Sequence, residues 1–94
     1  AFMSAAAPQV ATQNVTVYTM QYCPYCVRAK QLLTQRGIPF NEILVPDDDD
    51  AQWDELYRRS GMKTMPQIFA GERLIGGFSE LAQLDQKDRL SSLK

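Results

Sequence analysis

The sequence contains no histidine, and this absence narrows what the protein can do. It excludes His-based catalytic triads, a histidine general base and most catalytic zinc sites. Ten Lys and Arg residues nearly balance eleven Asp and Glu residues, so the net charge is −1. Nucleic acids and anionic membranes attract proteins with a basic surplus, so we expect neither as the main partner. No apolar run approaches the ~18–20 residues of a membrane span.

Cysteine is scarce as well, with two cysteines three positions apart. This number is far from that of a disulfide-dense secreted scaffold. The first residues have neither the basic and apolar segments of a secretory signal nor the arginines of a mitochondrial transit peptide. We therefore expect a cytoplasmic protein whose chemistry runs through sulfur.

A chain of 94 residues has room for one domain, and its composition of 45% apolar and 22% charged residues is ordinary for a globular protein. We expect residues 1–13 to form a disordered tail and residues 14–94 to form the folded domain. Because the chain begins with Ala1, we also expect Met3 to be the native start and Ala1-Phe2 to be a remnant, with a processed N-terminus as the alternative.

The first half of the chain predicts a strand, a helix and a second strand. Asn14–Thr19 is rich in β-branched and aromatic residues, which suits a buried strand. Pro24 is favoured at a first helical position, and apolar residues at helical spacing continue to Arg36 before Gly37 ends the helix. Ile38–Val45 is apolar and contains a proline near its start, so it predicts an edge strand. This order is typical of a parallel βαβ unit.

The second half predicts a helix, a hairpin and a last helix. We expect Trp53, Leu56 and Tyr57 to be core residues of a short helix that ends at Gly61. Two short apolar runs around a Gly-Glu turn predict a hairpin, and Ser79 is suited to cap the last helix. The expected order is β-α-β-α-β-β-α, an α/β fold with a mixed sheet.

Four consecutive aspartates, Asp47–Asp50, precede the second helix. They lack the spaced ligands and the central glycine of a calcium loop, so we expect no metal there. Acidic residues instead suit the N-terminus of the helix that follows.

The most informative feature is Cys23-Pro24-Tyr25-Cys26. Near a βαβ pattern, this spacing is typical of a thioredoxin-like redox motif. Cys23 falls at the helix N-terminus, where backbone N–H groups and the helix dipole favour a thiolate. Cys26 lies one turn further on the same face, where it should be less exposed. We therefore expect Cys23 to attack and Cys26 to resolve, while Pro24 keeps the turn rigid.

Two other interpretations of the cysteine pair remain open. A structural zinc site needs four ligands, and the sequence offers two cysteines and no histidine. The cysteines would then need carboxylates or a second chain to complete the site. Alternatively, both cysteines are buried and inert.

Three segments together resemble the dithiol class of glutaredoxins, over the chain from about Val15 to the last helix. They are Cys23-Pro-Tyr-Cys26, Thr64-Met-Pro-Gln-Ile-Phe69 and Gly76-Gly-Phe-Ser-Glu80, in the family's order and spacing. The resemblance implies a thioredoxin-like fold, with a four-stranded mixed sheet flanked by three helices. It also implies glutathione as the redox partner.

The resemblance assigns expected roles to individual residues. Tyr25 would flank a glutathione groove, Met65 would offer backbone hydrogen bonds, and the bond before Pro66 would be cis. Ser79 and Glu80 would hold the γ-glutamyl end, although both also suit purely structural roles at a helix start. The expected glutathione-binding residues are Tyr25, Lys63, Thr64, Met65, Pro66, Gly77, Ser79 and Glu80.

One position departs from the family pattern. Many dithiol glutaredoxins have a lysine three residues before the first cysteine, and this chain has Met20 there. That lysine is expected to help hold the thiolate and a glutathione carboxylate. Lys63 aligns with a position that is often basic, and it is the residue that would supply the charge here.

The resemblance implies a monomeric, glutathione-dependent oxidoreductase that reduces protein–glutathione mixed disulfides and protein disulfides, with glutathione as co-substrate and no metal. One alternative is a carrier of a 2Fe–2S cluster, bridged between two chains by two glutathiones and ligated by the first cysteine. The rigid Pro-Tyr pair and the available Cys26 argue against it. Another alternative is a redoxin that thioredoxin reductase reduces.

Overall fold

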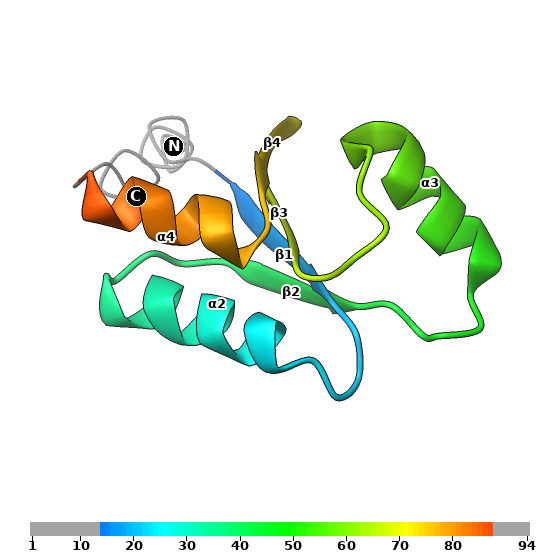
Figure 1. Ribbon diagram of the computed structural model, residues 1–94, viewed down its shortest axis with the longest axis horizontal. Helices are drawn as coiled ribbons and strands as arrows, with labels where there is room; N and C mark the ends of the chain where they lie inside the picture. The colour runs from blue at the N-terminus through cyan, green and yellow to red at the C-terminus, as the bar shows by residue number, and fades with distance from the viewer. Residues whose placement is uncertain (1–13, 88–94) are drawn as a thin grey trace, which may run out of the picture.

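The structure is a computed structural model that describes residues 14–87 (Figure 1). Its elements follow the predicted order, which confirms the expected fold class. They are β1 (Val15–Thr19), α2 (Pro24–Gln35), β2 (Asn41–Leu44), α3 (Asp50–Ser60), β3 (Gln67–Ala70), β4 (Arg73–Gly76) and α4 (Phe78–Gln86). The tail expected at residues 1–13 and the domain's last residues, 88–94, lie outside the described residues. None of the helices within 14–87 is long and apolar enough to cross a membrane.

The four strands form one mixed sheet in the order β2-β1-β3-β4. β1 is parallel to β2 and antiparallel to β3, and β3 is antiparallel to β4. β2 is an edge strand, as predicted, but it begins at Asn41 rather than Ile38. The reason lies at the end of α2, where the backbone N–H of Ile38 donates to the carbonyl of Leu33 at 2.9 Å. The N–H group of Ile38 therefore forms a hydrogen bond at the end of the helix and none to a neighbouring strand.

The sheet separates two apolar layers, with α2 and α4 on one face and α3 on the other (Figure 1). The first layer contains Val15 and Val17 of β1, packed with Leu33 of α2 and Leu81 of α4. Because side chains alternate along a strand, Tyr18 of β1 contributes to the second layer. The second layer also contains both cysteines, together with Val45, Leu56, Met65 and Phe69.

The helix α3 bears out part of what its sequence predicts. Leu56 is buried as expected, and Trp53 is half-buried with its indole N–H donating to the Pro46 carbonyl at 2.9 Å. The prediction of a core position was wrong for Tyr57, which is 47% exposed. Tyr57 lies one residue, or about 100°, around the helix from Leu56, so its ring points to the side and contacts the Lys63 ammonium.

The aspartate run serves the start of α3. Asp49 is the N-cap and accepts a hydrogen bond from the backbone N–H of Gln52 at 3.2 Å, while Asp50 occupies the first turn. Both positions satisfy or complement the partial positive charge of the helix N-terminus. Among residues 14–87, no three His, Cys, Asp or Glu side chains gather as a group that could hold a metal ion.

The helix α4 begins earlier than predicted. Gly77 is its N-cap, so Ser79 lies inside the first turn and the prediction of a Ser79 cap was wrong. The side chain of Glu80 takes over the role, accepting the backbone N–H of Gly77 at 2.7 Å. The chain turns sharply at Gly76, where φ is +128° and a Cβ atom would come within 2.8 Å of the Glu80 side chain.

Candidate active site at the Cys23–Cys26 pair

Cys23 is the N-cap of α2, and Pro24 takes the first helical position, as predicted. The backbone N–H of Cys26 donates to the Cys23 sulfur at 3.2 Å. A sulfur at this position receives both that N–H group and the positive end of the helix dipole. The local geometry therefore favours the thiolate form of a reduced Cys23.

In this structure the two cysteines are joined by a disulfide. Cys26 is 2% exposed and Cys23 7%, so Cys26 is the less exposed of the two, as expected. The Cys23 sulfur also lies 3.7 Å from the carbonyl oxygen of Met65. A disulfide sulfur has no proton to donate, so this is a contact in the oxidised state that a Cys23 thiol can convert into a hydrogen bond.

The loop before Cys23 contains a conformation that the sequence does not predict. Tyr22 has a φ of +58°, in the left-handed region that few non-glycine residues adopt, and it is 95% exposed. Its side chain lines the hollows on both sides of the disulfide. No local signal marks Tyr22, because neither glycine nor asparagine stands at this turn.

The first of these hollows, which we call the loop hollow, has a volume of about 630 Å³. It lies between the start of α2, the loop before β3 and the start of α4. All eight residues expected to bind glutathione line it together with Cys23 and Pro24. Sequence reasoning did not assign four further lining residues to a binding role, namely Met20, Tyr22, Met62 and Phe78.

The loop hollow combines backbone turns with a cation. The Met65–Pro66 peptide bond is cis, as the resemblance implied. The exposed Lys63 and the N-terminus of α4 both present positive charge to the hollow. The Tyr25 ring lies 6.1 Å from that of Phe78, which places an aromatic wall beside Cys23.

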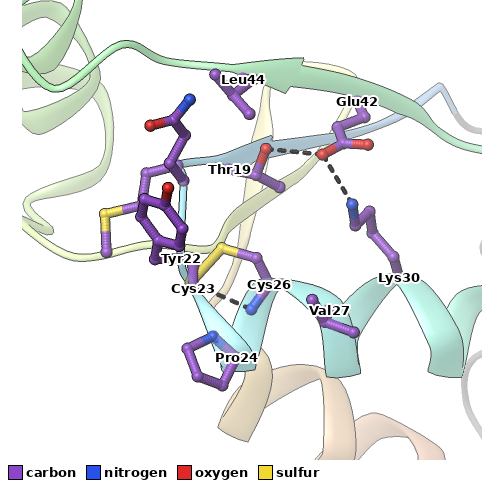
Figure 2. Close-up of a pocket in the computed structure, with 11 residues that line it drawn as sticks. Thr19, Tyr22, Cys23, Pro24, Cys26, Val27, Lys30, Glu42 and Leu44 are labelled. Atoms are coloured by element: carbon purple, nitrogen blue, oxygen red, sulfur yellow. Dashed lines mark hydrogen bonds and ion pairs between the residues drawn. A yellow bond between two sulfur atoms is a disulfide. The ribbon is translucent and has the colours of Figure 1, made fainter.

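The second hollow, which we call the helix–strand hollow, has a volume of about 500 Å³ and lies between α2 and the edge strand β2 (Figure 2). Cys26 lines this hollow and not the loop hollow, whereas Cys23 lines both. Its polar lining residues are Thr19, Lys30 and Glu42, together with Gln21 and Tyr22 of the loop before Cys23. Sequence reasoning missed this hollow, because Thr19, Lys30 and Glu42 come from separate elements without a shared motif.

Thr19, Lys30 and Glu42 form one hydrogen-bonded chain. Both the Thr19 hydroxyl and the Lys30 ammonium donate to the same Glu42 oxygen, Oε2, each at 2.9 Å. The hydrogen bond from Lys30 is the main reason why the pKa of Glu42 is lowered. Glu42 is therefore ionised at neutral pH, and its Oε2 atom forms an ion pair with the Lys30 ammonium at 2.9 Å.

Comparisons with known proteins agree with this site. The glutaredoxin family model matches residues 15–75. Glutaredoxin 3 of Escherichia coli K12 is 44% identical over 80 residues, which cover 85% of this chain and 95% of the relative. A glutaredoxin of Pseudomonas aeruginosa is 42% identical over 79 residues, covering 84% and 93%.

Two solved structures show the same likeness in three dimensions. A glutaredoxin of Brucella melitensis, 41% identical, superposes with a TM-score of 0.77 over 88% of this chain and 89% of its own. A buckwheat glutaredoxin–glutathione complex, 28% identical, has a TM-score of 0.78 over 96% of this chain and 84% of its own. With its dithiol pair at a helix N-terminus, the chain belongs to the glutaredoxin family and is a glutathione-dependent thiol–disulfide oxidoreductase.

Proposed function

We propose that the protein reduces protein–glutathione mixed disulfides and protein disulfides, with Cys23 as nucleophile and Cys26 as resolving thiol. One observation carries the proposal. Cys23 stands at the N-terminus of α2 and opens onto a hollow lined by all the residues that the family resemblance assigns to glutathione. The attacking sulfur and the glutathione site would then share one concave surface.

The chemistry of the loop hollow suits glutathione. This tripeptide has two carboxylates, for which Lys63 and the backbone N–H groups at the start of α4 are complementary. Its γ-glutamyl end also has an ammonium group, for which the exposed Glu80 carboxylate is complementary. Met65 would pair with the peptide backbone as an added strand does. The buckwheat relative solved as a glutathione complex supports this assignment.

Two routes follow from the two sulfurs. In the first, the Cys23 thiolate attacks the glutathione sulfur of a mixed disulfide, and the substrate's thiolate leaves. A second glutathione then attacks that same glutathione sulfur, which gives glutathione disulfide and restores the Cys23 thiolate. In the second, Cys23 attacks a protein disulfide and the Cys26 thiolate displaces the remaining protein thiolate. Two glutathiones then reduce the Cys23–Cys26 bond.

We further propose that the protein works as a monomer in the cytoplasm, with glutathione as co-substrate and without a metal. Glutaredoxin reduction potentials lie near about −200 to −230 mV, close to that of the cytosolic glutathione pool. Transfer between the dithiol and glutathione is then accessible in both directions, so the pool sets the redox state of the enzyme.

The two cysteine variants test these roles. Cys26→Ser should retain reduction of a mixed disulfide between glutathione and 2-mercaptoethanol and lose reduction of a peptide disulfide. Cys23→Ser should lose both activities, because the remaining thiol, Cys26, is 2% exposed and does not line the loop hollow. The reverse pattern would overturn the assignment.

Two measurements separate the alternative functions. Replacing glutathione with thioredoxin reductase and its electron donor, without thioredoxin, should leave the dithiol oxidised if glutathione is the reductant. Anaerobically purified protein should lack the visible absorbance of an iron–sulfur cluster, because the Cys23–Cys26 bond competes with cluster ligation.

A further inference from the structure

The second cysteine has chemistry of its own, and it takes place in the helix–strand hollow. Cys26 is 2% exposed, and the hollow beside α2 is the one that it lines. To close the disulfide, Cys26 must lose a proton and attack as a thiolate. When glutathione opens the disulfide by attacking Cys23, the electron pair of the broken S–S bond goes to Cys26, which leaves as a thiolate and takes up a proton.

The groups that favour a Cys23 thiolate do not serve Cys26 in the same way. Cys26 is the third residue of α2, and its own backbone N–H already donates to the Cys23 sulfur. The chain has no histidine that could exchange the proton. Apart from the two sulfurs, the apolar layer around Cys26 consists of Val45, Leu56, Met65 and Phe69 with the half-buried Tyr18, Met20, Trp53 and Leu74. Charged groups also approach this layer from α3, where the Arg59 guanidinium lies over the Phe69 ring at 4.5 Å, but Arg59 does not line the hollow that Cys26 lines.

The hollow supplies a cation and an anion from two different elements. Lys30 follows Cys26 by four residues on α2, so both lie on the same face of the helix. Glu42 comes from β2, and the buried Thr19 hydroxyl of β1 donates to its Oε2 atom and helps to fix it. Figure 2 shows Thr19, Lys30 and Glu42 facing the same space as Cys26. Apart from Cys23 and Cys26, the remaining titratable group in the lining is the exposed Tyr22.

We propose that the Lys30–Glu42 ion pair sets how readily the Cys26 thiol ionises, and so controls the dithiol route of the enzyme. Lys30 stabilises the Cys26 thiolate, and Glu42 opposes it. Neither residue touches substrate, so both are positioning residues that act through Cys26. The inference deepens the function proposed above and depends on the resolving role of Cys26 in it.

The test removes one charge at a time and follows reduction of a peptide with one intramolecular disulfide, with glutathione as reductant. Lys30→Gln should slow this reaction by about threefold to tenfold and move the midpoint of its pH profile upward, because only the anion remains. Glu42→Gln should accelerate it by about twofold to fivefold and move the midpoint downward. The double variant should lie near the wild type.

Opposite signs are the signature of the proposal. If the ion pair served only to hold β2 against α2, both single variants would shift the rate in the same direction, and that outcome would overturn the proposal. Thermal unfolding of each variant checks that the fold is retained. We expect the fold to tolerate both substitutions, because both side chains are partly exposed.

Two controls make the result specific to Cys26. In a Cys26→Ser background, Lys30→Gln and Glu42→Gln should leave reduction of the small glutathione mixed disulfide unchanged. A change there would mean that the pair acts on Cys23, which contradicts the proposal.

The ion pair between Arg36 of α2 and Asp85 of α4, at 2.6 Å, is a matched pair that lines neither hollow. Arg36→Gln and Asp85→Asn should leave the rate and its pH profile unchanged.

Activity on the small mixed disulfide distinguishes a failure of the proposed function from a failure of the ion-pair proposal. A wild-type protein without activity on the small mixed disulfide would contradict that function. Normal activity on this substrate with no opposite shift on the peptide disulfide would contradict the role of the ion pair alone.

Discussion

The two hollows beside the disulfide are built from different parts of the fold. The loop hollow is formed largely by turns, namely the segment 62–66 with its cis peptide bond and the Gly76-Gly77 turn into α4. The helix–strand hollow is formed by α2 and the ends of β1 and β2, together with the loop that joins β1 to α2. Cys23 opens onto both, while Cys26 opens onto the helix–strand hollow.

The hollows also differ in charge. In the helix–strand hollow, Lys30 and Glu42 neutralise each other at 2.9 Å. In the loop hollow, Lys63 stands near the positive end of α4, and the Glu80 carboxylate is tied to the Gly77 N–H. The difference suits a division of labour, in which an anionic tripeptide binds in one hollow and proton exchange with the buried thiol occurs in the other.

The largest expected effect comes from the turn that forms the loop hollow. Gly76→Ala should destabilise the protein by about 2–4 kcal/mol, because φ is +128° and the new Cβ would meet the Glu80 side chain. Chemical unfolding measures the loss, and a rise in the KM for glutathione would report damage to the hollow. Gly71→Ala is the matched control, since it has a φ of +63° with open space around it and should cost only about 1 kcal/mol. Equal losses would show that the contact with Glu80 does not matter.

Reversing the charge of Lys63 tests whether the positive charge of the loop hollow serves glutathione binding. Lys63→Glu should raise the KM for glutathione by about fivefold to tenfold, because an exposed charge contributes up to about 1 kcal/mol in each sense. The effect should shrink at high salt. Arg73→Glu changes the net charge equally at an exposed position of β4 that lines neither hollow. If this control raises the KM as much, the local position of Lys63 is not what matters.

The smallest effect is expected at the boundary of the two hollows, where Met20 lines both. Met20→Lys should raise the turnover of a glutathionylated substrate by about twofold to fivefold, because a cation beside Cys23 favours its thiolate. Met20→Leu, which adds no charge, should leave turnover unchanged. Steady-state kinetics measure both, and an unchanged or lower rate for Met20→Lys would show that this position does not tune the site.

Much of the fold was predictable because its signals are local. Pro24 at a first helical position and Gly37 and Gly61 at helix ends set boundaries that the structure confirms. The cap of α4 was not predictable in this way. Ser79 is a good N-cap residue by type, but the sharp turn at Gly76 starts the helix earlier and leaves the capping role to Glu80.

The two hollows differ in the same way, because the residues of one were predictable from local sequence and those of the other were not. A resemblance in three short segments was enough to name its expected ligand-binding residues, and the structure brings all of them to one surface. The helix–strand hollow has no such signal. Thr19, Lys30 and Glu42 meet only because β1 pairs with β2 in parallel and α2 packs beside them.

The sequence by itself determined the chemistry of this protein. Two cysteines at helical spacing, a proline between them and no histidine leave sulfur at a helix N-terminus as the reactive group. Only the tertiary structure decided how the two sulfurs differ in their surroundings. The Cys23 sulfur contacts Met65, which lies 42 positions further along the chain. Cys26 lines a hollow together with residues of the strand β2. Such contacts exist only once the sheet has formed.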